Sequence, residues 1–580
     1  MCGSKMRVAV IDRDRCQPKK CSLECIKYCP PVRNGIEAIV MKDDKPVVSE
    51  ELCVGCGICI HKCPFKAIHI ENLADELESE LVHQYGENGF RLFRLPSPSL
   101  GKVVGILGEN GIGKTTAINI LAGKLKPNLG RWDDEPSWSE VIDYWRGSQL
   151  ANYFKKLADS KIKISYKPQY VDKLASYNGT VKQLLNEMDC EGKGLEDIMG
   201  RHVGHLAGGE LQKVAITIAL ERDADIYFFD EPSSYLDIKN RIEMAKKIRE
   251  LAERKMVIVI EHDLAVLDFL ADIVHIMYGK KGVYGVVAGA KNVRHGINLY
   301  LSGYLKEENI RFGEEIKFEK HPPREKPESM PLIQFEGIKK RFSDFELEVK
   351  GGEIYEGEVV GIVGPNGIGK TTFVKILAGV IEADEGKVNK KIKVSYKPQY
   401  IKASEGMVGE AFEKNKEKFH ALYEKEVLHP LGIHELYERE LKSLSGGELQ
   451  MVAVALCLSM EADVYLIDEP SAYLDAKQRM NVAKVIRRIM EKEGKAAMVV
   501  EHDVYFIDMV SQALMVFSGQ PGKHGIGMGP YSLREGMNLF LKDLGITFRR
   551  DEDSNRPRVN KLDSKLDRMQ KEIGEYYYEI

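Results

Sequence analysis

The chain contains one module twice, and this duplication constrains its fold more than any other feature. Residues 108–116, Gly-Glu-Asn-Gly-Ile-Gly-Lys-Thr-Thr, return at 364–372 as Gly-Pro-Asn-Gly-Ile-Gly-Lys-Thr-Thr. Other segments repeat in the same order: 166–170 with 396–400, 206–210 with 444–448, and 261–263 with 501–503. Ordered repetition of this kind predicts two copies of one domain within the 580 residues.

Each copy carries a phosphate-binding loop in the context that such a loop requires. A β-rich run, 103–107, precedes G-x-x-x-x-G-K-T, and 117–122 has the pattern of a helix. Backbone amides and the helix N-terminus would surround the phosphates, a lysine would reach the β and γ oxygens, and a threonine would offer its hydroxyl to Mg²⁺. The loop residues expected to bind nucleotide are Gly108, Asn110, Gly111, Gly113, Lys114, Thr115 and Thr116, and their counterparts Gly364, Asn366, Gly367, Gly369, Lys370, Thr371 and Thr372.

Two hydrophobic runs, 226–231 and 464–469, end in paired carboxylates. A buried strand rarely ends in two acids without a functional reason, so the first acid of each pair is predicted to hold Mg²⁺ through water and the second to act as general base. A glutamine in each copy can reach the metal or the attacking water, and a histidine can orient the γ-phosphate end. These predicted residues are Asp230, Glu231, Gln169 and His262 in the first copy, and Asp468, Glu469, Gln399 and His502 in the second.

The N-terminal region is rich in cysteine. Nine of the 11 cysteines lie at or before Cys63, whereas Cys190 and Cys457 stand alone and are interpreted as small buried residues. Residues 53–64, Cys-x-x-Cys-x-x-Cys-x-x-x-Cys-Pro, match the bacterial ferredoxin run for a [4Fe-4S] cluster, and 16–30 is a looser version. Because the fourth cysteine of that run ligates the other cluster, the expected sets are Cys16, Cys21, Cys25 and Cys63 for one cluster, and Cys29, Cys53, Cys56 and Cys59 for the other. Zinc stays open as an alternative, and Cys2 is left over.

The spacing of the repeats locates an insertion and the domain boundaries. The first copy has about 26 extra residues near 131–163, and this stretch holds all three tryptophans, Trp132, Trp138 and Trp145. Helical spacing predicts one amphipathic helix around 138–145 and a second around 151–158, which either pack on their own domain or form a docking surface. We expect a head at 1–72, domains at 73–315 and 330–550 joined by a linker at 316–329, and a charged tail at 551–580 that includes a short surface-packed helix.

Charge and hydropathy narrow the class of protein. The chain has 84 Lys plus Arg against 88 Asp plus Glu, a formal net charge of -4, so any contact with RNA must come from local patches. It contains no apolar run of the roughly 18 to 20 residues that a membrane-spanning helix needs, and its N-terminus lacks a signal-peptide core. We therefore expect a cytoplasmic protein without a membrane partner.

Residues 444–448, Leu-Ser-Gly-Gly-Glu, with Pro-Ser-Ala-Tyr-Leu-Asp at 470–475, resemble the signature and D-loop of ABC ATPases, a resemblance that covers nearly all of 73–550. It implies a head-to-tail pair of domains, in which each ATP lies between one phosphate loop and the other domain's signature. Lys114 would share its site with Ser445, Gly446, Gly447 and Glu448, and Lys370 with Ala207, Gly208, Gly209 and Glu210, with Asp237 and Asp475 as the D-loop acids.

Two details of the nucleotide sites follow. The family signature usually has serine where this chain has Ala207, so the second site should lose a hydroxyl to the γ-phosphate, and the two sites are predicted to be non-equivalent. Tyr85 and Phe342 are candidates for stacking on adenine, with core packing as an equal alternative.

The whole arrangement is similar to the E-subfamily of ABC proteins, the ribosome-recycling ATPases also called the RNase L inhibitor family. The expected fold is α/β: a ferredoxin-like two-cluster iron–sulfur domain followed by two tandem ABC-type ATPase domains with a hinge formed by 294–301 and 534–541. The resemblance implies a cytosolic factor of archaea and eukaryotes that uses ATP and Mg²⁺ at two sites, and two [4Fe-4S] clusters, to split ribosomes after a release factor or a Pelota-type rescue factor.

By the same resemblance, the factor then stays on the small subunit and its rRNA, with initiation factors as further partners, and acts as a monomer with an internal pseudo-dimer. The insertion would contact rRNA and the head would act as a lever. An alternative is an ATPase that gates electron transfer from the clusters to a partner enzyme. A chromosome or repair ATPase is less favoured, because no long heptad segment interrupts either copy.

Overall fold

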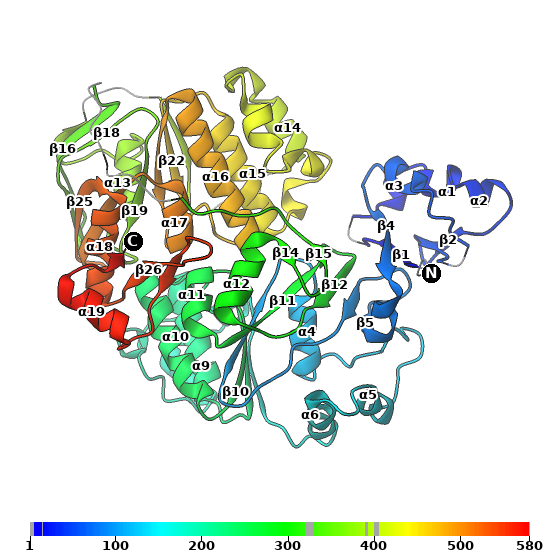
Figure 1. The fold of residues 1–580 in the computed structure, drawn as a ribbon. Helices are drawn as coiled ribbons and strands as arrows, with labels where there is room; N and C mark the ends of the chain where they lie inside the picture. Colours follow the sequence, from blue (N-terminus) through cyan, green and yellow to red (C-terminus); the bar gives the residue numbers. More distant parts are fainter. Residues whose placement is uncertain are drawn as a thin grey trace.

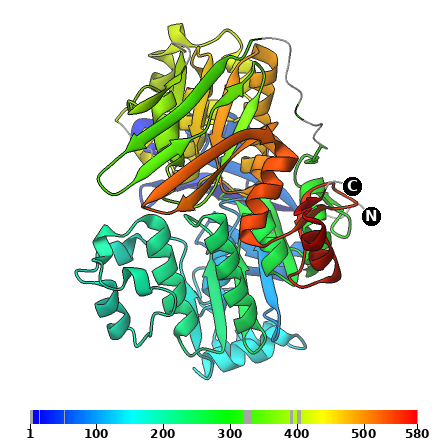
Figure 2. The same cartoon turned by 90° about the vertical axis from the view of Figure 1, so that its left-hand side faces the viewer.

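The computed structural model describes residues 5–13, 15–50, 52–319, 324, 330–388, 393–399 and 405–578. A small head lies to one side of two larger α/β domains that are stacked on each other (Figures 1 and 2). Cys2 and most of the predicted linker lie outside the described residues.

The head is built from short strands and one-turn helices. Strand β1 (Lys5–Ile11) pairs antiparallel with β4 (Ile68–Ala74), and β2 (Ile39–Lys42) forms a hairpin with β3 (Lys45–Val48). Helices α1 (Glu24–Lys27), α2 (Pro30–Arg33) and α3 (Ile58–Lys62) carry the cysteine-rich loops, and β4 extends past the boundary predicted at residue 72. The apolar core is small and includes several cysteines, and domains of this size commonly gain stability from bound metal.

A mixed sheet with a parallel centre forms the first ATPase domain. Its strands follow the order β5 (Leu81–Gln84), β6 (Arg91–Phe93), β12 (Tyr284–Val287), β11 (Ile273–Lys280), β7 (Val103–Leu107), β10 (Met256–Ile260), β9 (Ile226–Asp230) and β8 (Ile164–Lys167), with β13 (Lys291–Asn292) paired to β11. Its main helices are α4 (Lys114–Leu121), α8 (Val181–Glu187), α9 (Gly208–Glu221), α10 (Ile238–Ala252), α11 (Leu264–Leu270) and α12 (Val293–Ser302).

Helices cover both faces of this sheet, because its central strands are hydrophobic throughout. All five residues of β7 are buried. Val103 packs into the cluster that contains α10 and α11, whereas Val104 packs into the cluster that contains α4. Continuous apolar strands of this kind are typical of parallel sheets with two covered faces.

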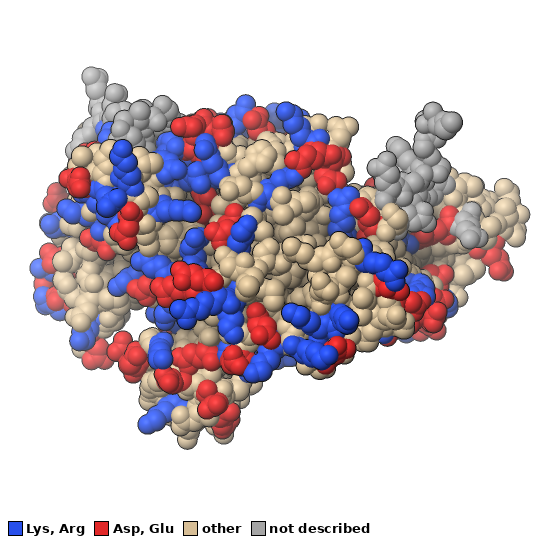
Figure 3. Space-filling view, turned by 60° about the horizontal axis from the view of Figure 1, so that its bottom comes forward, with Lys and Arg blue, Asp and Glu red and all other residues tan. Residues whose placement is uncertain are grey.

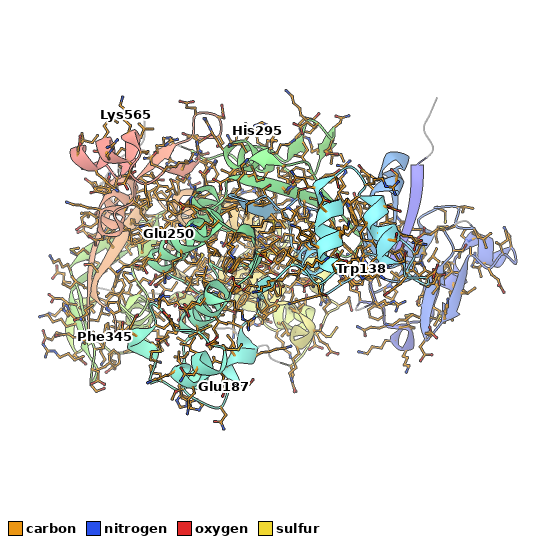
Figure 4. The ribbon with its side chains drawn as sticks, turned by 90° about the horizontal axis from the view of Figure 1, so that it is seen from below. Trp138, Glu187, Glu250, His295, Phe345 and Lys565 are labelled. Atoms are coloured by element: carbon orange, nitrogen blue, oxygen red, sulfur yellow. The ribbon has the colours of Figure 1, made fainter. Side chains whose placement is uncertain are left out.

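The predicted insertion forms two helices, α5 (Trp138–Tyr144) and α6 (Gln149–Ala158), which lie at an edge of the first domain (Figures 1 and 4). Trp145 stacks on Phe154, with ring centroids 4.5 Å apart, and Phe154 is fully buried. Trp138 packs against the same cluster, whereas Trp132 is 38% exposed and lies 5.7 Å from the ammonium of Lys42 in the head. Two of the tryptophans therefore pack within the domain and the third lies at the head.

The second ATPase domain repeats this plan. Its sheet runs β18 (Gly352–Ile354), β16 (Ile333–Arg341), β17 (Glu346–Val349), β25 (His524–Ser532), β24 (Ala513–Gln520), β19 (Val359–Val363), β23 (Ala496–Val500), β22 (Val464–Asp468) and β21 (Val394–Lys397), with β20 (Glu385–Val388) paired to β16. Its helices are α13 (Lys370–Leu377), α14 (Val408–Glu413), α15 (Gly446–Ser459), α16 (Ala476–Glu493), α17 (Val504–Val510) and α18 (Leu533–Leu544).

The C-terminal segment is part of the packed structure. Strands β26 (Phe548–Arg550), β27 (Pro557–Val559) and β28 (Tyr577–Tyr578) form a small sheet beside α19 (Lys565–Ile573), so the boundary predicted at residue 550 cuts through this sheet. Leu566 and Met569 of α19 are 43% and 40% exposed, so these two side chains are only partly covered.

One buried arginine of this segment joins the two ATPase domains. Arg556 is fully buried and pairs with Asp268 of α11 at 3.0 Å. It also donates to Asn298 Oδ1 of α12 at 2.9 Å and bonds the Tyr505 hydroxyl of α17. The segment thereby connects the first domain, one predicted hinge helix and the second domain.

Among the described residues, no helix has the length and apolar character needed to cross a bilayer. Lysine and arginine are intermingled with aspartate and glutamate over the face shown in Figure 3.

Candidate nucleotide and iron–sulfur sites

Both phosphate loops connect a central strand to the N-terminus of a helix. The loop after β7 turns at Gly111 and Gly113, whose φ angles of 78° and 91° favour glycine, and α4 begins at Lys114. Lys114 Nζ donates to the carbonyl oxygens of Gly108 at 3.0 Å and Glu109 at 2.6 Å. The ammonium group is therefore held inside the loop, where β and γ phosphate oxygens would sit.

The second loop has the same geometry. Lys370 Nζ donates to the carbonyls of Gly364 and Pro365, both at 2.7 Å. Burial lowers the pKa of Lys370 to about 8, and the nearby Glu469 carboxylate opposes that shift. An anionic ligand would restore the charged state of this lysine, which fits a site built for phosphate.

Each threonine and the first acid of each pair meet at the end of a strand. Thr115 Oγ1 donates to Asp230 Oδ2 at 3.1 Å, and Thr371 Oγ1 donates to Asp468 Oδ2 at 2.7 Å. Burial and the adjacent Glu231 raise the pKa of Asp230 to about 6. Asp468 Oδ1 is buried and has no hydrogen-bond partner among the described residues, so the donor set fits a bound cation.

The second acids lie beside the predicted glutamines and histidines. Gln169 Nε2 donates to Glu231 Oε1 at 2.7 Å, and His262 Nε2 lies 3.5 Å from the same oxygen. In the second copy Gln399 donates to Glu469 Oε1 at 2.7 Å, and His502 Nε2 lies 3.7 Å from that oxygen.

In the second copy, burial disfavours the charged forms of Glu469 and His502. Burial and the adjacent Asp468 raise the pKa of Glu469, and burial lowers the pKa of His502. Both ring nitrogens of His502 are buried without a hydrogen-bond partner in the described part of the chain. A neutral imidazole with free nitrogens suits a group that contacts a ligand.

Sequence reasoning missed two residues that hold the predicted general base in place. Glu231 has a φ of 46°, an unfavourable conformation for a non-glycine residue, and its carbonyl accepts hydrogen bonds from Lys167 Nζ at 3.2 Å and Gln212 Nε2 at 2.9 Å. Lys167 is 1% exposed and also donates to the carbonyl of Asp230 at 2.9 Å. This lysine is repeated in both Tyr-Lys-Pro-Gln-Tyr segments, and that repetition was the sequence feature that could have indicated its role.

The sites are shared between the two ATPase domains, as the head-to-tail arrangement requires. A cavity of about 360 Å³ is lined by Ala207, Gly208 and Gly209 of the first domain and by the phosphate loop of the second. Asp237 Oδ2 accepts the Asn366 amide at 3.0 Å, and Asp475 Oδ2 accepts the Asn110 amide at 3.0 Å. Each D-loop acid therefore contacts the opposite phosphate loop.

The two signatures differ at their second residue. Ser445 Oγ caps α15 and donates to Glu448 Oε2 at 2.9 Å, whereas Ala207 has no side-chain cap and only its backbone amide donates to Glu210 Oε2, at 2.9 Å.

The predicted adenine-stacking residues, Tyr85 and Phe342, are 45% and 46% exposed, so neither is a core residue. Tyr85 lies near the first loop, with its hydroxyl 3.4 Å from Thr116 Oγ1. Sequence reasoning missed a second aromatic pair that packs against the loops. A Cβ built on Gly113 would come within 2.6 Å of Phe90, and one on Gly369 within 2.9 Å of Phe345, which also lines the shared cavity.

In the head, the first predicted set of cysteines gathers around one space. Cys16, Cys21, Cys25 and Cys63 line a single small cavity. Burial raises the pKa of Cys25 to about 12, and its neighbours Cys63, Cys21 and Cys16 raise it further.

The cysteines of the second set also lie near one another. Burial raises the pKa of Cys59 to about 11, with added contributions from Cys53, Cys56 and Cys29. Within the described residues, no three metal-ligating side chains converge closely enough to hold a single ion. Sulfur ligands of one zinc ion would lie within about 4 Å of each other, since Zn–S bonds are about 2.3 Å.

The sequence matches three family descriptions. Residues 97–234 and 349–472 match the ABC transporter family, residues 6–37 match a possible Fer4-like domain in RNase L inhibitor, and residues 46–69 match a 4Fe-4S binding domain. The chain is 45% identical to translation initiation factor RLI1 of Saccharomyces cerevisiae, over 100% of this chain and 99% of the yeast protein. The chain belongs to the RNase L inhibitor family, the E-subfamily of ABC proteins.

Solved structures of this family have the same fold. A model of ribosome-bound archaeal Pelota and ABCE1 matches with a TM-score of 0.93 and 53% identity, covering 99% of this chain and 100% of that chain. The complex of archaeal ribosomal stalk protein aP1 with archaeal ribosome recycling factor aABCE1 matches with a TM-score of 0.82 and 54% identity, covering 87% of this chain and 100% of that chain.

These matches confirm the family and the fold class predicted from the sequence. They also show that this RNase L inhibitor family member is an ATPase with two ATP and Mg²⁺ sites and a [4Fe-4S] head.

Proposed function

We propose that this protein is an ATP-driven recycling factor that splits ribosomes into subunits. It would act after a release factor or a Pelota-type rescue factor and remain on the small subunit. The observation that carries this proposal is the full-length likeness to a structure described as ribosome-bound archaeal Pelota and ABCE1. A relative described as an archaeal ribosome recycling factor supports the same activity. None of the relatives reported above is described as an electron carrier, so the electron-transfer alternative gains no support.

The arrangement of the nucleotide sites supports specific roles in hydrolysis. Lys114 and Lys370 would bind the β and γ phosphates, and the threonine, glutamine and first acid of each copy would hold Mg²⁺. Glu231 and Glu469 would take a proton from the water that attacks the γ-phosphorus, while the bond to the β–γ bridging oxygen breaks and ADP leaves. His262 and His502 would orient the γ-phosphate.

The clusters would stiffen the head. Cys16, Cys21, Cys25 and Cys63 would hold one cluster, and the other four predicted cysteines the second. Cysteine thiols with raised pKa values lose their protons when iron binds. Without iron the head would lack the iron–sulfur bonds and would be much less stable. A stiff head can transmit displacement to a ribosomal subunit.

A short set of contacts couples the head to the first ATPase domain. Asn88 Nδ2 donates to the Val48 carbonyl at 2.9 Å, and Asn88 Oδ1 accepts the Val48 amide at 2.7 Å. The Ile11 amide donates to the Asn88 carbonyl at 2.9 Å, and Arg91 pairs with Glu50 at 2.5 Å. Closure of the ATPase domains on ATP would therefore move the head, because Asn88 and Arg91 belong to the segment that leads into strand β6.

Sucrose-gradient sedimentation tests this function. Purified ribosomes would be mixed with the iron-loaded protein, its cognate release or rescue factor, and ATP. We expect free subunits with the wild-type chain, and a Glu231→Gln/Glu469→Gln variant that sediments with the small subunit. Intact ribosomes with no bound protein, despite measurable ATP turnover, would exclude recycling.

A further inference from the structure

The interface at the first nucleotide site carries two ion pairs between the ATPase domains. Lys281, in the turn after β11, pairs with Glu448 of the opposite signature at 2.9 Å. Lys477, at the start of α16, pairs with Glu109 of the first phosphate loop at 2.7 Å. Both bonds cross the boundary that has to open when nucleotide leaves.

The Lys281 pair is built into the site. A Cβ on Gly111 would come within 2.7 Å of Lys281 Cγ, so the lysine stem lies against the phosphate loop. Glu448 is 7% exposed, and Arg439 of its own domain is a second partner at 2.9 Å. Although burial opposes ionisation, Lys281 and the Ser445 amide lower the pKa of Glu448 to about 2, so it stays charged at neutral pH.

At the second site, prolines occupy the positions equivalent to Lys281 and Glu109. The turns are equivalent, because Gly282 donates to the Gly111 carbonyl at 3.0 Å and Gly522 donates to the Gly367 carbonyl at 2.9 Å. The residue before each of these turn glycines is Lys281 in the first copy and Pro521 in the second.

The phosphate loops also carry a charged residue in the first copy and a proline in the second. Glu109 corresponds to Pro365, whereas Lys477 has a lysine counterpart, Lys239. In the part of the chain that the structure describes, Lys239 makes no ion pair, and Glu210 pairs only with Arg201 of its own domain. Among the described residues, Glu210 of the signature at the second site thus has no charged partner across the interface.

We infer that Lys281–Glu448 and Glu109–Lys477 form a one-sided latch that holds the first composite site closed longer than the second. The two prolines leave the second site free to open first. This inference rests on the shared nucleotide sites of the proposed function and adds a structural cause for their difference that is independent of Ala207.

Retention of trapped ATP at each site tests the latch. Glu231→Gln traps ATP at the first site and Glu469→Gln at the second. In each holo variant, loss of radiolabelled ATP is followed after a chase with unlabelled ATP. Lys477→Ala should speed loss from the first site about two- to fivefold, as expected for one partly exposed ion pair, and leave the second site unchanged. The effect should shrink in 1 M salt.

A graft supplies the matched control. Pro365→Glu places the glutamate of the first loop opposite Lys239, and it should slow loss from the second site about two- to fivefold. Adding Lys239→Ala should cancel this gain. Equal effects of Lys477→Ala at both sites, or no effect of the graft, would overturn the latch. If neither Gln variant retains ATP, the shared sites themselves are wrong, and the latch falls with them.

Discussion

The sharpest prediction concerns Asn88, which fastens the head to the first ATPase domain. The residue is 3% exposed and its side-chain amide satisfies both backbone groups of Val48, at 2.7 and 2.9 Å. Asn88→Gly removes the side chain without adding strain, because the residue has a φ of 53° and glycine accepts that conformation. The backbone bond from Ile11 remains possible.

The magnitude follows from the groups left behind. Two buried polar groups of Val48 lose their partners, at about 1 to 3 kcal/mol each, and water can partly replace the lost bonds. We expect a net cost of about 3 kcal/mol in docking of the head, which shifts the equilibrium between docked and detached heads about 100-fold. Hydrogen exchange in 45–50 and 88–93 should rise accordingly.

We expect Asn88→Gly to uncouple ATP hydrolysis from ribosome splitting. ATP turnover should change less than twofold, because the nucleotide sites are untouched, and iron content should not change. Ribosome splitting should fall at least tenfold. Asn88→Asp should lose at least as much, because it keeps the acceptor for the Val48 amide but places a buried carboxylate where the Asn88 amide now donates to the Val48 carbonyl and, at 3.4 Å, to Glu50 Oε1. Full splitting by Asn88→Gly, with raised hydrogen exchange in the head, would refute this coupling.

Three further predictions concern other parts of the chain. Glu231→Gln and Glu469→Gln should leave unequal ATPase rates, and Ala207→Ser should tighten ATP binding at the second site, by up to about 1.5 to 3 kcal/mol in isothermal titration. Arg556→Met should destabilise the domain interface by about 3 kcal/mol, seen as earlier unfolding in calorimetry, because it leaves the buried Asp268 with a single ion-pair partner, Arg558. Cys29→Ser should halve the iron content and the visible iron–sulfur absorbance, whereas loss of all iron would show that the two clusters do not assemble independently.

The duplicated domain and its local motifs could be predicted from the sequence. Phosphate loops and acidic strand ends are local patterns, and their chemistry dictates their spacing. The resemblance of the duplicated signature to that of ABC ATPases then implied that each loop lies opposite the other domain. The two cysteine sets rest on ferredoxin spacing, which encodes which cysteine serves which cluster, and they stay a prediction.

What escaped prediction depends on contacts between residues far apart in the chain. Residues 551–578 are highly charged, which is typical of a solvated tail, yet Arg556 is buried because Asp268, 288 positions away, neutralises it. Lys167 is a buried lysine in a strand, and only the fold shows that two carbonyls of the acidic turn receive its ammonium group. Periodicity carries no information on such pairings.

The latch illustrates the same limit. Lys281 and Pro521 look like ordinary turn residues, and their difference gains meaning only when Glu448 is placed opposite one of them.

The central claim is that closure of the two nucleotide sites splits ribosomes through the head. The most direct measurement follows light scattering of purified ribosomes with the rescue factor and ATP, and phosphate release in the same cuvette, for the full chain and for a chain that lacks residues 1–72. The account predicts similar phosphate release from both proteins, and a fall in scattering only with the full chain. Splitting by the truncated chain at the full-length rate would contradict it.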